Sequence, residues 1–139
     1  MFACLAVLFG AILLYTRENN FSTSYHPDEL PKARQLITHQ RAYLHPQLLL
    51  EGTELVSKIN EEQSTPDTTA IRQIILNGRW VSAVFAALAV TAFALIGYCY
   101  AGFAGFFVTA LLVGLCPSIL LNAHYMKEDA AFLFGVATT

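Results

Sequence analysis

The chain has 139 residues, of which 55% are hydrophobic and 13% are charged. A typical soluble domain carries about 25% charged residues, so this composition argues against a freely soluble domain. The net charge of -2 comes with no basic stripe, and nothing in the sequence indicates nucleic-acid binding. Residues 1–16 and 80–126 carry no charge, which predicts an all-α, multi-pass membrane protein, because a helix needs about 20 apolar residues to cross a bilayer.

Residues 1–16 are predicted to form the first transmembrane helix. The segment is short for a span, since a helix rises only about 1.5 Å per residue. A secretory signal peptide is the competing interpretation. The segment lacks a basic start, and no small-x-small cleavage site follows it, so we favour a transmembrane helix.

Residues 17–78 are predicted to form a long loop that contains two amphipathic helices. The first begins near Pro27, which suits a first helical turn, and turns Lys32 away from its apolar face. That face comprises Leu30, Ala33, Ile37 and Gln40. The second helix follows Pro46 and has a face comprising Leu48, Gly52, Leu55 and Ile59. Such helices suit a membrane surface or a contact with neighbouring helices.

Residues 79–121 are predicted to cross the membrane twice. The charge-free stretch is too long for one span and fits two spans joined by a tight turn. We place the spans at about 79–98 and 105–121, with the turn near Gly102 and Gly105. Arg79 is expected to anchor the start of the first of these spans at the membrane interface.

The remaining residues are predicted to form a short loop and the beginning of another helix. The loop covers residues 122–129, and a fourth transmembrane helix begins in residues 130–139. Pro117 is expected to kink the preceding span near its end. About three full spans and the start of a fourth result, and the polypeptide is expected to continue beyond Thr139.

The two polar segments are expected to face the same compartment. If residues 79–121 form a hairpin of two spans, the loop before it and the segment after it emerge on one side. Asp28 and Glu29 could then share a site with the acids near residue 129. Residues 17–79 hold seven of the eight Lys and Arg residues, which favours the cytoplasm, although the positive-inside rule weakens for a loop of about 60 residues.

Asp28 and Glu29 are the leading catalytic candidates. Carboxylates at a membrane boundary are costly unless they are paired, solvated or bound to metal. Adjacent residues project in different directions from a helix, so one carboxylate can face a site while the other pairs with the scaffold. We expect Asp28 to act as a general base; the alternative is an ordinary acidic helix start, which the helix dipole favours. Tyr25, His26 and His45 are supporting candidates.

A second candidate group comprises His124, Lys127, Glu128 and Asp129, for a donor phosphate or a divalent metal ion. His124 and Glu128 are four residues apart, as are Tyr125 and Asp129, and on a helix this spacing puts each pair on one face. Lys127 could neutralise an acid or contact a lipid phosphate. The alternative is an interfacial cap that starts the last helix.

These motifs together resemble the GT-C superfamily of polytopic glycosyltransferases. The nearest branch holds the protein O-mannosyltransferases and the lipid A aminoarabinose transferases. The resemblance rests on the acidic pair 28–29 in a large first loop, a Leu-His-Pro-Gln-Leu segment at 44–48, Arg79 and Ser82, and a His-Tyr-x-Lys-x-Asp segment at 124–129. It covers nearly the whole chain but only the N-terminal part of such an enzyme.

The resemblance implies that the first loop is extracytoplasmic, that Asp28 is the catalytic aspartate with Glu29 as its partner, and that Asp129 lies near the donor phosphate. The donor would be a polyprenyl-phosphate sugar in the membrane lipid. The acceptor would be a protein, a lipid or a glycan, and some relatives use a divalent metal. An integral position in the bacterial inner membrane is favoured over the endoplasmic reticulum. Because later spans grip the substrates, an isolated fragment would be inactive.

Two other functions stay open. An ion or solute transporter subunit would carry charges near mid-span, and the predicted spans carry none. A non-catalytic membrane assembly protein would use the acidic clusters to bind a partner. Full-length homologues without the Asp28 carboxylate would favour that second reading.

Overall fold

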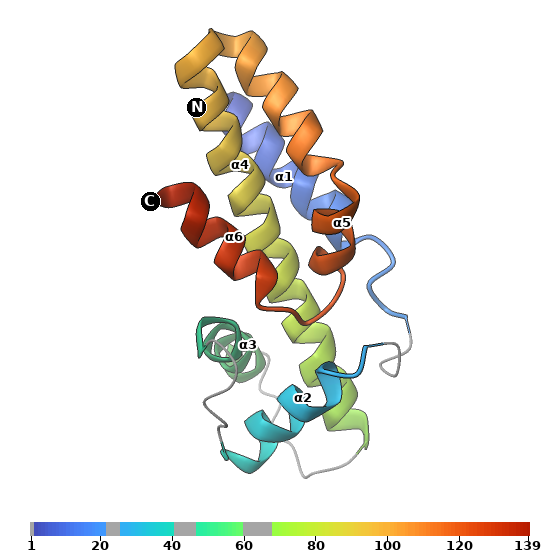
Figure 1. Cartoon of the computed structure of the whole chain (residues 1–139). Coiled ribbons are helices and arrows are strands. Elements are labelled where there is room, and N and C mark those ends of the chain that lie inside the picture. The colour runs from blue at the N-terminus through green and yellow to red at the C-terminus, as the bar shows by residue number, and fades with distance from the viewer. Residues whose placement is uncertain (1, 22–25, 41–46, 60–67) are drawn as a thin grey trace.

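The computed structural model describes residues 2–21, 26–40, 47–59 and 68–139. Every regular element in these ranges is a helix, which confirms the all-α prediction. The helices are α1 (Phe2–Thr16), α2 (Glu29–Thr38), α3 (Gln47–Ile59), α4 (Thr68–Gly114), α5 (Pro117–Ala123) and α6 (Asp129–Thr138). The long helix α4 runs through the whole molecule and contacts each of the others (Figure 1).

Two hydrophobic cores lie along α4. The first core packs α1, α5 and α6 against a row of alanines on α4, among them Ala83, Ala86 and Ala87. Small residues allow helix backbones to approach closely, as is common between membrane helices. The hydroxyl of Tyr15 donates a hydrogen bond to the carbonyl of Gly114 (2.8 Å), which fastens the end of α1 to the end of α4.

The second core packs α2 and α3 against the N-terminal part of α4. It comprises Ala33, Leu36, Leu49, Leu50, Ile74, Ile75, Val81 and Met126. Figure 1 shows α2 and α3 at one end of the molecule, away from the bend in α4. The fold therefore has an apolar bundle with a smaller layer of amphipathic helices at one end.

The helix α4 changes direction within the turn predicted near residues 98–105. Ala101 and Gly102 leave the helical conformation, and Gly102 has a φ of 60°, which glycine adopts without strain. The chain reverses there, so that α4 consists of two arms (Figure 1). The arms touch at Gly97 and Gly105, where a Cβ atom on Gly97 would lie 2.6 Å from the Gly105 carbonyl oxygen.

We expect Gly105→Ala to lower the thermal stability of the protein in detergent. A methyl group at this position would collide with backbone atoms of Gly97, which cannot move aside cheaply. Gly10→Ala is the matched control, because a Cβ there meets no atom within 4 Å and alanine is the better helix former. A Tm for Gly105→Ala equal to or above that of Gly10→Ala would contradict the close contact between the arms.

The helix lengths do not support three full spans. In the described part of the chain, Thr69–Gly114 is the one helix long and apolar enough to cross a membrane. The apolar helices α1 and α6 have 15 and 10 residues, fewer than the roughly 20 that a span needs. The expected kink at Pro117 is a complete break, because Cys116 is extended, as residues before proline prefer to be, and Pro117 starts α5.

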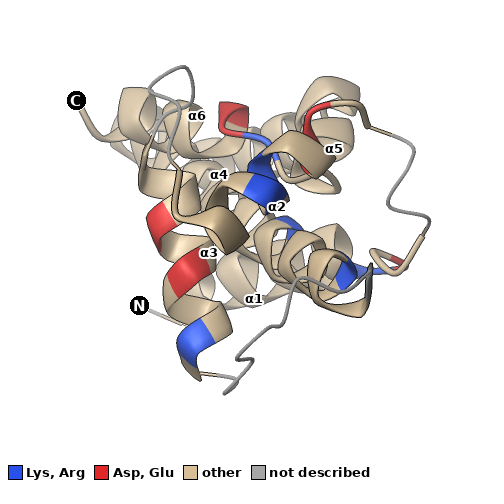
Figure 2. Ribbon diagram, turned by 90° about the horizontal axis from the view of Figure 1, so that it is seen from below, with Lys and Arg blue, Asp and Glu red and all other residues tan. Residues whose placement is uncertain are grey.

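The buried faces of α2 and α3 differ from the predicted ones. Glu29, Lys32, Ala33 and Leu36 are the buried residues of α2, so the prediction that Lys32 turns away was wrong. Lys32 is buried because its ammonium group binds partners on a distant segment of the chain. In α3 the buried residues are Leu49, Leu50 and Thr53, whereas three of the four residues of the predicted face, namely Leu48, Leu55 and Ile59, are exposed. The charged residues of α3 lie along yet another side of the helix (Figure 2).

Candidate functional site

A fully buried ion pair joins α2 to α4. The Arg79 guanidinium donates to both carboxylate oxygens of Glu29, from Nη2 at 2.6 Å and from Nε at 2.8 Å, and neither side chain is exposed. Its Nη1 donates to the carbonyls of Asn19 (3.0 Å) and Phe21 (2.9 Å). The guanidinium carbon also lies 3.8 Å from the centre of the Phe21 ring. Bidentate pairing of this kind fixes geometry as well as charge.

The backbone of Met126 is clamped between two charged residues of α2. The Met126 amide donates to Glu29 Oε1 (2.9 Å), and the Met126 carbonyl accepts from Lys32 Nζ (3.0 Å). The same ammonium forms an ion pair with Glu128. The Met126 side chain is fully buried over Gly78, where no space remains for a Cβ atom. These contacts fasten residues 122–129, the second polar segment, to the first loop.

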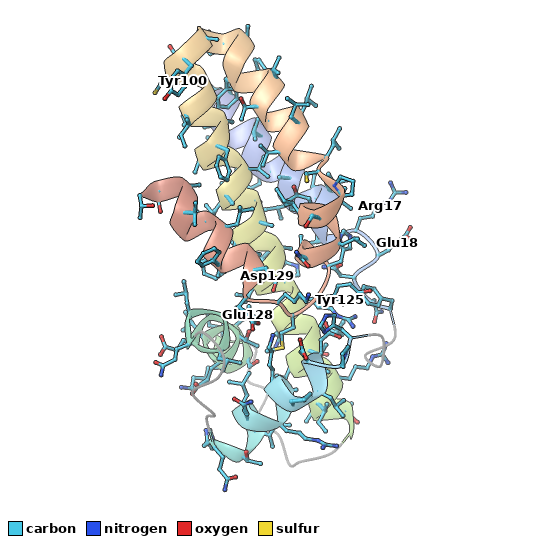
Figure 3. All side chains as sticks on the ribbon, in the orientation of Figure 1. Arg17, Glu18, Tyr100, Tyr125, Glu128 and Asp129 are labelled. Carbon is cyan, nitrogen blue, oxygen red and sulfur yellow. The ribbon has the colours of Figure 1, made fainter. Side chains whose placement is uncertain are left out.

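A serine on α4 holds the next residue of the same segment. The Ser82 hydroxyl accepts from the Lys127 amide and donates to the Lys127 carbonyl, both at 3.1 Å. Figure 3 shows the labelled Tyr125, Glu128 and Asp129 where the apolar bundle meets the layer of α2 and α3. Residues from the first loop, from α4 and from the second segment therefore meet at one junction.

Asp28 lies outside the buried network. Its side chain is 54% exposed, and although it precedes α2 it makes no capping hydrogen bond. Its backbone amide donates to Nδ1 of His26 (3.2 Å), and its carboxylate lies 3.8 Å from the same nitrogen. The His26 ring lies 5.1 Å from the Tyr125 ring, which in turn meets the edge of Phe21. An exposed carboxylate thus stands beside an aromatic cluster built from both polar segments.

An open groove of about 430 Å³ adjoins this cluster. Its lining comprises Phe21, Leu120, Leu121, His124 and Tyr125. Nδ1 of His124 lies 2.6 Å from the Leu120 carbonyl oxygen, so this nitrogen carries a proton and donates a hydrogen bond to that oxygen. The lining is mostly apolar, with imidazole and phenol groups among it, and this suits an aliphatic chain that ends in a polar group.

The structure brings the two predicted site groups together. Glu29 bonds to the Met126 backbone, and Glu128 pairs with Lys32. Glu29 is fully buried, with its carboxylate bonded to Arg79 and to the Met126 amide, so it holds the start of α2 against α4. Asp129 is exposed at the start of α6, with Lys127 Nζ 3.7 Å from its carboxylate. Tyr25 and His45 lie outside the described residues.

The helical spacing expected for the second group is wrong. Helix α5 ends at Ala123 and α6 begins at Asp129, so residues 124–128 form a turn instead of a continuous helix. The amides of Met126 and Lys127 bond to Glu29 and Ser82, which are side chains of other segments. His124 therefore does not share a helical face with Glu128.

Two residues central to the junction were missed by sequence reasoning. Arg79 was expected to anchor the membrane interface, yet it is buried against Glu29. Lys32 was expected to face away, yet it is 1% exposed. The only signal in the sequence is that Arg79 directly precedes a long charge-free stretch, where a cation without a partner would be costly.

Within the residues described, no three His, Cys, Asp or Glu side chains come close enough to hold a metal ion. Comparison of the chain with protein-family models, with curated proteins and with solved structures finds no match. In its described residues the protein is all-helical, with one helix long and apolar enough to cross a membrane and an ionic junction where the apolar bundle meets the layer of α2 and α3.

We expect Lys32→Met to loosen the second polar segment. The change removes the donor to the Met126 carbonyl and the cation paired with Glu128, and losing a buried hydrogen bond costs about 1–3 kcal/mol. Hydrogen exchange of peptides covering residues 122–129 should therefore become faster. Arg34→Met is the matched control, because Arg34 is an exposed cation on the same helix. Equal exchange in both variants would contradict the clamp.

Proposed function

We propose that the chain is the N-terminal part of a membrane glycosyltransferase. It would move a sugar from a polyprenyl-phosphate donor to a hydroxyl of a protein, a lipid or a glycan. The observation that carries this proposal is the placement of Asp28, an exposed carboxylate beside an apolar groove at the polar end of an apolar bundle. This is where the headgroup of a lipid-linked donor would meet an acceptor at the membrane surface.

The proposed reaction is a single displacement. The Asp28 carboxylate takes the proton of the acceptor hydroxyl, and the hydroxyl oxygen attacks the anomeric carbon of the sugar. The bond between that carbon and the phosphate oxygen breaks, so polyprenyl phosphate leaves and the anomeric configuration inverts. A phosphate leaving group needs no general acid. Glu29 and Arg79 would serve by holding the loop that carries Asp28.

We further propose a multi-pass arrangement in a bacterial inner membrane. In this arrangement α1, the two arms of α4 and α6 lie within the bilayer, and α2 and α3 lie at its surface. Support comes from large apolar side chains that point outward on these helices, among them Leu13 of α1, Leu112 of α4 and Phe132 of α6. The exposed Leu55 and Ile59 of α3 would contact lipid from the surface. The polypeptide beyond Thr139 would supply further spans.

The proposal is tested by offering a panel of polyprenyl-phosphate sugars to the full-length polypeptide in proteoliposomes. We expect one donor to be consumed, with release of an equal amount of polyprenyl phosphate. A folded protein that consumes no donor would overturn the proposal. Ion flux in the same liposomes would then favour a transporter, and its absence would favour an assembly protein.

A further inference from the structure

The imidazole of His26 is held in one tautomer by the backbone beside it. The Asp28 amide donates to Nδ1, so this nitrogen presents its lone pair and the proton of the neutral ring lies on Nε2. The ring packs against Tyr125, and the side chain is 17% exposed. Within the described residues, Nε2 donates to no acceptor. The structure therefore holds a fixed N–H donor next to an exposed carboxylate.

His124, the second described histidine among the candidates, has the opposite arrangement. In His124, Nδ1 carries the proton and donates a hydrogen bond to the Leu120 carbonyl, so Nε2 of the neutral ring presents a lone pair. A neutral His124 can accept a hydrogen bond at the groove but cannot donate one from Nε2. His26 can donate without taking up a proton. Of these two imidazoles, only that of His26 suits an anionic oxygen in its neutral form.

We propose that the Nε2–H of His26 binds a phosphate oxygen of the lipid-linked donor. The inference rests on the proposed function and assigns the leaving phosphate its hydrogen-bond donor. During transfer the phosphate changes from a diester with one negative charge to a monoester with two. A donor fixed before the reaction stabilises that added charge without reorganisation. The groove shared with Tyr125 would hold the first part of the aliphatic chain against Leu120 and Leu121.

Two substitutions at His26 distinguish the contribution of Nδ1 from that of Nε2. In His26→Asn the side-chain oxygen can still accept from the Asp28 amide, as in an Asx turn, but the donor is lost. In His26→Gln the longer amide places an N–H near the position of Nε2. We expect His26→Asn to lower the kcat for donor consumption about 100-fold, with little change in KM, because the new charge develops only in the transition state. His26→Gln should recover most of the loss.

A binding measurement tests the same contact without turnover. Undecaprenyl phosphate is titrated into the full-length polypeptide in phosphatidylcholine nanodiscs, with phosphatidylglycerol as competitor. We expect His26→Asn to weaken binding about tenfold to a hundredfold, as for a lost hydrogen bond to a charged group, and His26→Gln to weaken it less.

Unchanged binding and kcat in His26→Asn, or equal losses in both variants, would overturn the inference. Equal displacement by phosphatidylglycerol would overturn the assignment to the donor, since the site would then read any lipid phosphate. Donor consumption by the wild-type protein tests the proposed function independently of the His26 variants. Binding that depends on His26 without consumption of any sugar donor would keep the contact and overturn the transferase. Equal consumption of a sugar donor by the wild type and by both variants would keep the transferase and overturn the contact.

Discussion

Replacing Arg79 with methionine is expected to destabilise the fold by about 3–5 kcal/mol, because the fully buried Glu29 carboxylate loses its bidentate partner. The same change removes donors from the Asn19 and Phe21 carbonyls. Unfolding in mixed micelles with increasing sodium dodecyl sulfate measures the loss. A loss below about 1 kcal/mol would contradict the role of this pair in the fold.

A second substitution should relieve much of that loss. In Arg79→Met combined with Glu29→Gln, no uncompensated charge is buried, and the glutamine oxygen can still accept from the Met126 amide. Lys58→Ala is the control, because Lys58 is an exposed cation paired with the partly exposed Glu54, and pairs at the surface contribute about 0–1 kcal/mol. A double variant as unstable as the sum of its single variants would show that the pair is not coupled.

Asp28→Asn is expected to lower donor turnover about 10²–10⁴-fold, the usual contribution of a general base, while leaving stability unchanged. Stability should hold because the side chain is largely exposed and makes no capping hydrogen bond. Turnover is measured as release of polyprenyl phosphate by the full-length polypeptide in proteoliposomes.

Two further acids provide the controls for Asp28. Glu18→Gln alters an exposed carboxylate in the connection that follows α1 and should leave turnover unchanged (Figure 3). Asp129→Asn should lower turnover less than Asp28→Asn, because Asp129 would act on the donor phosphate and not on the acceptor proton. Turnover unchanged in Asp28→Asn and lost in Asp129→Asn would move the base to the second segment.

Much of the scaffold follows from local sequence properties. The all-α class, the long apolar helix and the turn near Gly102 depend on hydrophobicity and on glycine, which a single segment reveals. The expected hairpin of two spans at residues 79–121 predicts that Asp28 and Asp129 lie on the same side of the membrane. In the structure the residue after Asp28 bonds to the Met126 amide, so the two segments lie together.

The details of the junction could not be predicted from the sequence. Lys32 and Glu128 are 96 positions apart, and Arg79 and Glu29 are 50 apart, so no local pattern identifies the pairs. A lysine at a helix start normally faces water, and only a tertiary partner makes its burial favourable. The turn at 124–128 was missed for the same reason, since side chains from distant segments satisfy its amides.

The central claim is that Asp28 and Asp129 belong to one site on one face of the membrane, opposite the turn between the arms of α4. Side-specific labelling in sealed membrane vesicles tests this claim most directly. Asp28→Cys and Asp129→Cys are each placed in a chain without other cysteines, and a third chain keeps only Cys99, which is exposed near the turn. We predict that an impermeant maleimide labels positions 28 and 129 from the same side and Cys99 from the other. Labelling of 28 and 129 from opposite sides, or of all three from one side, would contradict the account.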